Sequence, residues 1–112
     1  MPYKEPVIEQ FHYPIGQVAQ MLNVDISTIR YWSDKFDEII KPQRTVRGNR
    51  MYTPQDIETF TIIHNLVKNQ GMTLEGAKKR ISENREGEYE NVKIIKRLEN
   101  IKAKLLEIKD LL

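Results

Sequence analysis

The chain has 112 residues, the size of one compact domain with a modest hydrophobic core. Its 18 Lys and Arg residues nearly balance 16 Asp and Glu residues, so the net charge of +2 does not by itself indicate a polyanionic partner. Without cysteine there is no disulfide or thiolate metal site, and no apolar run resembles a signal peptide or a membrane span. We therefore expect a cytoplasmic protein with no metal, cofactor or membrane partner.

Residues 15–36 have the pattern of two helices joined by a sharp turn, after a flexible start over residues 1–12. Ala19 is small enough for close helix contact, and Asn23, four residues later, readily takes the left-handed backbone of a turn. Ile29, six residues further on, begins an apolar stripe on the second helix. These separations are typical of a helix-turn-helix, although an ordinary helical hairpin would satisfy most of them.

A basic segment follows the second helix. Residues 41–50 contain four bases and no acid, and the Gly48-Asn49 step between extended segments predicts a small hairpin, or wing. Beside the polar face of the second helix, the wing would form one continuous phosphate-facing surface. The alternatives are a hairpin whose charges only keep it soluble and, for Arg50, a structural role beside Tyr52.

Two further helices are predicted after the wing. Thr53, Pro54 and Asp56 form a strong helix start, with Thr as the cap and Pro in the first turn. An apolar stripe follows, and Gly71 is expected to end this helix. Thr73 then caps a short fourth helix that carries basic residues on its outer side.

The end of the chain has the pattern of a coiled coil. After a predicted polar hinge at residues 84–88, apolar residues recur at spacings of 4, 3, 4, 3 and 4. Residues 91–112 would form a rod roughly 33 Å long. The alternative is a helix that lies on its own domain. The predicted dimerisation residues are Ile94, Leu98, Ile101, Leu105, Ile108 and Leu112.

Three blocks, at residues 13–32, 48–57 and 71–77, resemble the MerR family of bacterial winged-helix regulators in sequence and in order. The resemblance implies that the second helix enters the major groove and that Arg30, Tyr31 and Tyr52 stand at positions used for contacts to the DNA backbone. It also implies a second wing near residues 71–73 and an antiparallel pair of dimerisation helices. The chain departs from the family pattern at Trp32, Ser33 and Asn49.

Together, pattern and resemblance predict a mainly α winged helix-turn-helix domain with a β-hairpin wing at residues 13–84, and a coiled-coil dimerisation helix at residues 88–112. The expected function is sequence-specific binding of double-stranded DNA as a homodimer that regulates transcription. The resemblance also implies that the protein distorts promoter DNA so that misaligned elements read by RNA polymerase come into register. The candidate DNA-binding residues are Ser27, Thr28, Arg30, Tyr31, Lys35, Arg44, Arg47, Asn49, Arg50 and Tyr52.

No enzyme is expected, because the sequence has no glycine-rich phosphate loop, nucleophile motif or metal-ligand spacing. His12 and His64 are too far apart in the chain to suggest a zinc site. Two alternatives remain. One is a DNA-architectural factor, such as a recombination directionality protein. The other is an adaptor whose heptads recruit a partner protein.

Overall fold

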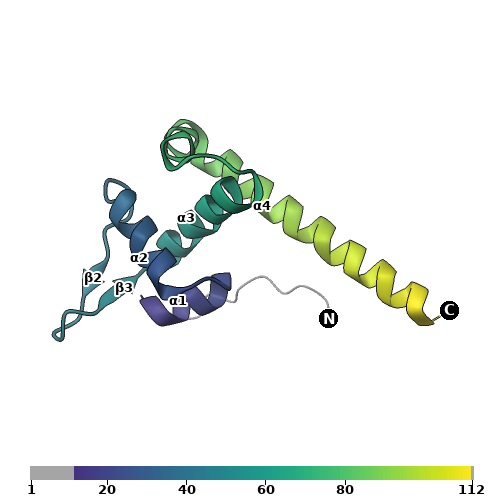
Figure 1. Ribbon diagram of the computed structural model, residues 1–112, viewed down its shortest axis with the longest axis horizontal. Coiled ribbons are helices and arrows are strands. Elements are labelled where there is room, and N and C mark those ends of the chain that lie inside the picture. The colour runs from purple at the N-terminus through teal and green to yellow at the C-terminus, as the bar shows by residue number, and fades with distance from the viewer. Residues whose placement is uncertain (1–11, 112) are drawn as a thin grey trace.

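The computed structural model describes residues 12–111, so the predicted flexible start up to residue 11 and the seam residue Leu112 lie outside the described residues. A helical head with a small sheet carries one long helix that projects away from it (Figure 1), and the whole measures 55 × 31 × 22 Å. No helix in the described part combines the length and hydrophobicity needed to cross a membrane. In chain order the elements are β1 (Tyr13–Pro14), α1 (Ile15–Leu22), α2 (Ile26–Lys35), β2 (Gln43–Arg44), β3 (Arg50–Tyr52), α3 (Pro54–His64), the π-helical turn η1 (Asn65–Asn69) and α4 (Leu74–Leu111).

The turn between α1 and α2 is formed by Asn23, as the sequence predicts. Its backbone is left-handed, with φ 55° and ψ 47°, and the next residue, Val24, donates its N–H to the carbonyl of Ala19 at 3.0 Å. Ala19 and Ile29 are both buried, which locks the two helices together. Asp25 is the N-cap of α2, but its side chain makes no capping hydrogen bond.

The sheet has three antiparallel strands in the order β1-β3-β2. The predicted hairpin is confirmed as β2 and β3, joined by a turn in which Gly48 has φ 83° and donates its N–H to Thr45 at 2.8 Å. The third strand, β1, pairs Tyr13 with Tyr52 and was not predicted. Two residues, one of them Pro14, are too short a run to give a strand pattern.

The start of α3 is the predicted capping box. The N–H of Asp56 donates to Thr53 Oγ1 at 3.2 Å, and the N–H of Thr53 donates to the Asp56 carboxylate at 3.0 Å. The helix does not run on as α-helix to Gly71, because after His64 it widens into η1, where the N–H of Gln70 donates to Asn65 at 3.0 Å. Gly71, with φ 68°, then turns the chain towards α4.

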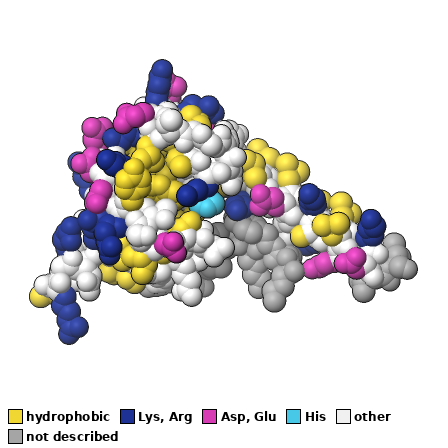
Figure 2. All heavy atoms as spheres, in the orientation of Figure 1, with side chains coloured by type: hydrophobic (Ala, Val, Ile, Leu, Met, Phe, Trp, Pro, Cys, Tyr) yellow, Lys and Arg dark blue, Asp and Glu magenta, His cyan; other side chains and the backbone are white. Residues whose placement is uncertain are grey.

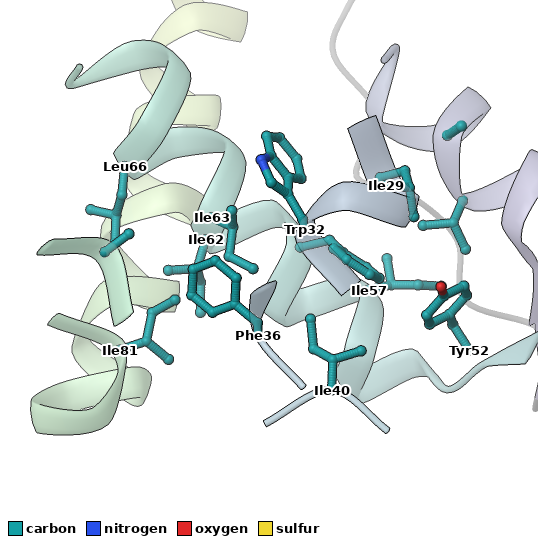
Figure 3. Close-up of a cluster of buried hydrophobic side chains, with 14 of the residues drawn as sticks. Ile29, Trp32, Phe36, Ile40, Tyr52, Ile57, Ile62, Ile63, Leu66 and Ile81 are labelled. Carbon is teal, nitrogen blue, oxygen red and sulfur yellow. The ribbon is translucent and has the colours of Figure 1, made fainter. Parts of the chain in front are cut away.

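The core lies where α2, α3 and the first part of α4 meet (Figure 3). Phe36, which directly follows α2, is fully buried near Ile62 and Ile63 of α3. Trp32 packs edge-on against His64 at 6.1 Å between ring centroids, and Tyr52 packs in the same way against Phe60 at 5.2 Å. Trp32 and Tyr52 are therefore structural side chains in this fold.

Helix α4 is two helices joined at a kink. Only Asn84 leaves helical geometry, with φ −157° and ψ 71°, and its side-chain oxygen accepts the N–H of Gly87 at 3.0 Å. The predicted polar hinge over residues 84–88 is thus wrong in extent, because Asn84 caps a new helix that begins at once. At about 1.5 Å per residue, residues 85–111 form a rod about 40 Å long, which we call the rod.

Two arginines hold the rod against the head. Arg80 and Glu88 form an ion pair at 2.9 Å across the kink, and the Glu88 carboxylate is almost fully buried. Arg85 binds the carbonyl of Gln55 at 3.0 Å and the carboxylate of Glu58 at 3.3 Å, both on α3. The direction of the rod is therefore set by side chains on both sides of the kink.

The cap at the kink is testable. Asn84→Ala should lower the free energy of unfolding by about 1 kcal/mol, because the first turn of the rod loses its side-chain acceptor. Urea denaturation would measure this. Ser82→Ala, two residues earlier on the same exposed stretch, is the control and should change stability by less than about 0.5 kcal/mol. Equal effects of the two substitutions would show that the Asn84 cap contributes nothing of its own.

Candidate nucleic-acid interface

Helix α2 has one buried and one polar face. Ile29 and Trp32 are at most 2% exposed, and this fixes the opposite face towards solvent. Tyr31 is 51% exposed, and the Lys35 ammonium lies 5.7 Å from the centroid of its ring. Of the predicted contact residues on this helix, Thr28 is half-buried, and the exposed ones are Ser27, Arg30, Tyr31 and Lys35.

The wing presents a second group of basic side chains. Arg44, Arg47 and Asn49 are exposed, and the Arg44 guanidinium donates to the carbonyl of Gly48 at 3.0 Å, which holds it against the turn. Val46 at the tip of the wing is fully exposed. Lys and Arg side chains gather on this end of the molecule, at the lower left of Figure 2.

A hollow of about 380 Å³ lies between α2 and the wing. Three arginines line it, Arg30 from α2 and Arg44 and Arg50 from the hairpin. The guanidinium group suits phosphate oxygens because it is planar, always charged and rich in hydrogen-bond donors. Because Arg50 is paired with Asp34, the groups around the hollow that favour an anion there are Arg30 and Arg44.

Arg50 and Tyr52 differ from the other predicted contact residues. Arg50 has a side chain only 18% exposed and pairs with Asp34 of α2 at 2.9 Å. Burial alone would lower the pKa of Arg50, but the neighbouring Tyr52 hydroxyl and Asp34 carboxylate raise it above its ordinary value. Tyr52 is fully buried. In this conformation both residues stabilise the junction of wing and core, which is the structural alternative expected for Arg50.

The other side of α2 faces the turn into α4. Tyr31 and Lys35 share a groove with Thr73, Glu75 and Lys78. This places the predicted second wing, residues 71–73, beside the exposed face of α2. Sequence reasoning did not connect Lys78 with this surface, because it lies on the helix pattern as an ordinary solvated charge and only the packing brings it to α2. Nor did it pair Asp34, which lies on α2 itself, with Arg50 of the hairpin.

The helix-turn-helix of α1 and α2 with a β-hairpin beside it defines the chain as a winged helix-turn-helix protein. Residues 13–84 match the family model described as MerR HTH family regulatory protein. The chain belongs to the MerR family and carries the DNA-binding domain of its transcriptional regulators.

Two curated relatives are regulators. Regulator protein TubY of a Clostridium botulinum C phage is 33% identical over 87 residues, which cover 78% of this chain and 36% of TubY. The HTH-type transcriptional regulator MlrA of Escherichia coli K12 is 33% identical over 57 residues, which cover 51% of this chain and 23% of MlrA. The chain thus spans roughly a quarter to a third of these relatives.

Two solved structures share the fold over most of the chain. A MerR family transcriptional regulator from Bacillus thuringiensis is 33% identical with a TM-score of 0.52, over 89% of this chain and 83% of that one. HiNmlR, a MerR family regulator lacking the sensor domain and bound to promoter DNA, is 25% identical with a TM-score of 0.54, over 89% of this chain and 77% of that one.

Proposed function

We propose that this chain binds duplex DNA as a homodimer and regulates transcription by placing α2 in the major groove and the wing beside it. The observation that carries the proposal is the arginine-lined hollow between α2 and the wing. It places Arg30 and Arg44 on one surface, and none of the described residues that line it is an Asp or Glu. HiNmlR, which shares the fold, is itself bound to promoter DNA.

The DNA contacts that we propose are chosen by the solvent exposure of each candidate side chain. Tyr52 is left out, because its ring would have to leave the core to reach DNA, and Arg50 acts by positioning α2 against the wing. Contacts to phosphate fix the position of the head, whereas contacts from α2 to base edges give sequence specificity. The proposed DNA-facing residues are Ser27, Thr28, Arg30, Tyr31, Lys35, Arg44, Arg47 and Asn49.

The rod supports dimerisation. The five seam residues among those described, from Ile94 to Ile108, are 50–61% exposed, so in this structure the seam does not lie on its own head. Figure 2 shows apolar side chains along the rod at the right. A row of apolar side chains at heptad spacing is buried most effectively by the same row of a second copy. The dimer seam we propose consists of Ile94, Leu98, Ile101, Leu105 and Ile108, and continues to Leu112 in the sequence.

We extend this proposal to the relative direction of the two dimerisation helices and to the effect of the dimer on transcription. An antiparallel pair of rods, each about 40 Å long, would separate the two heads by a distance comparable to one turn of DNA, about 34–36 Å. The family resemblance further suggests that the dimer distorts the promoter so that RNA polymerase can use it.

The test is a selection of bound fragments from genomic DNA, followed by fluorescence anisotropy of the selected duplex at increasing salt. We expect a site with two half-sites about one turn apart and an affinity that falls by at least about 100-fold between 50 and 200 mM salt. An architectural factor would instead select several adjacent sites and bend them sharply. Absence of duplex binding even at low salt would contradict the proposal and leave the adaptor alternative.

A further inference from the structure

Between residues 97 and 110 the charges of the rod are sorted by side. At about 100° per residue, the five described seam residues, from Ile94 to Ile108, centre on one line along the helix. Four basic side chains lie within roughly 60–80° of that line, two on each side, and the acidic side chains lie about 140° or more away from it. The basic four, which we call the basic flanks, are Arg97, Lys102, Lys104 and Lys109, and the acidic ones are Glu99, Glu107 and Asp110.

The basic flanks are open to solvent beside the seam. All four side chains are exposed, and no ion pair joins any of them to another residue in the described range 12–111. Glu99, the acid nearest in the chain to the first of them, pairs instead with Lys96 at 3.7 Å. The four positive charges are therefore available to whatever helix covers the seam.

A second copy of the rod would bring like charges together. Side chains that flank the apolar row of one helix face those of its partner helix, and their charges help to determine which helices pair. In a parallel pair, Lys104 would face Lys109 of the other copy. In an antiparallel pair centred on Ile101, Arg97 would face Lys104. Both contacts are repulsive, so the proposed homodimer would bury its apolar seam against an opposing charge.

We propose that the seam also binds an amphipathic helix of a different protein, one with Asp or Glu on both sides of its apolar row, and binds it more tightly than a second copy. The apolar row would cover the seam in the same way, while each flanking contact changes from repulsion to attraction. One exposed charge pair changes affinity about two- to threefold, so four such contacts give at least about tenfold. The pairing does not require DNA. Its effect on DNA binding, through loss of the second head, rests on the proposed function.

The probes are two fluorescently labelled synthetic helices that share one row of Ile and Leu at the spacing of the seam. They differ only at the flanking positions, which are Glu in one helix and Lys in the other. Fluorescence anisotropy measures their binding to the full chain without DNA. We expect the Glu-flanked helix to bind at least about tenfold more tightly at about 50 mM salt, and the difference to shrink to about threefold or less at about 1 M salt. Sedimentation equilibrium should show the homodimer replaced by a complex of one chain with one Glu-flanked helix.

A double variant and a matched control assign the preference to the basic flanks. Lys102→Gln combined with Lys104→Gln should reduce the preference for the Glu-flanked helix at least about threefold and should strengthen the homodimer, because two of the four charges are gone. Lys41→Gln combined with Lys79→Gln removes the same charge from exposed positions on the head. This control should change neither quantity by more than about twofold.

Sedimentation equilibrium of the chain alone measures the homodimer separately. A chain that stays monomeric but binds the Glu-flanked helix would contradict the homodimer and support the acidic partner. Equal or tighter binding of the Lys-flanked helix would overturn the acidic partner, and so would a homodimer that excess Glu-flanked helix does not displace. In the latter case a second copy is the occupant of the seam. A monomeric chain that binds neither helix would overturn both proposals.

Discussion

Ile101→Asp is expected to convert the protein from a dimer into a monomer. Ile101 lies in the middle of the seam and is 53% exposed in the single chain. In a paired rod, each chain would place a carboxylate in an apolar interface, at a cost of several kcal/mol. A loss of about 4 kcal/mol weakens dimerisation about 1,000-fold, which sedimentation equilibrium would detect.

Leu106→Asp is the matched control. Leu106 is 52% exposed and lies on the same helix, but outside the heptad seam, so the same exchange of an apolar side chain for a carboxylate should leave the dimer intact. The Ile101→Asp monomer should also bind the selected duplex at least about 100-fold more weakly, because the second head no longer binds at high effective concentration. Dissociation by both substitutions, or by neither, would contradict the seam.

Arg30→Ala is expected to produce the largest loss of DNA affinity with an unchanged fold. Arg30 is exposed on α2 and lines the hollow shared with Arg44, and Ala is a good helix former at that position. One charged hydrogen bond contributes about 1.5 kcal/mol or more, and a dimer loses two, so affinity should fall about 100-fold. The slope of log affinity against log salt should decrease by about 2.

Lys102→Ala removes the same charge from the exposed middle of the rod and serves as the control, with an expected change of less than about threefold. The helical content and the unfolding midpoint of Arg30→Ala should match those of the natural protein. A loss of affinity that varies with the base sequence would show that Arg30 reads a base edge instead of phosphate. An unchanged affinity would remove Arg30 from the interface.

Much of the fold could be read from local chemistry. The capping box at Thr53 and Asp56 and the left-handed turn at Asn23 depend only on neighbouring residues, and both are confirmed. The apolar stripes of α2 and α3 follow the helical period, so their buried faces could also be predicted. The three sequence blocks identified the family, which the match over residues 13–84 confirms.

Features that depend on contacts between distant residues could not be predicted. Strand β1 exists only because β3 offers it hydrogen-bonding partners, and its two residues carry no pattern of their own. Asn84 confines the kink to one residue because its side chain caps the next helix, whereas composition alone indicated a longer polar hinge. A polar stretch shows that a chain is solvated, but not how it is folded.

For the candidate interface, the sequence by itself determined which residues are basic and which helix face is polar, because charge and helical period are local properties. Tertiary structure decided which of these residues are exposed and unpaired enough to contact DNA. Tyr52 is fully buried and Arg50 is paired with Asp34, while Arg30 and Arg44 meet around one hollow. The physical reason is that burial and pairing depend on distances in space, which helical period and composition do not encode.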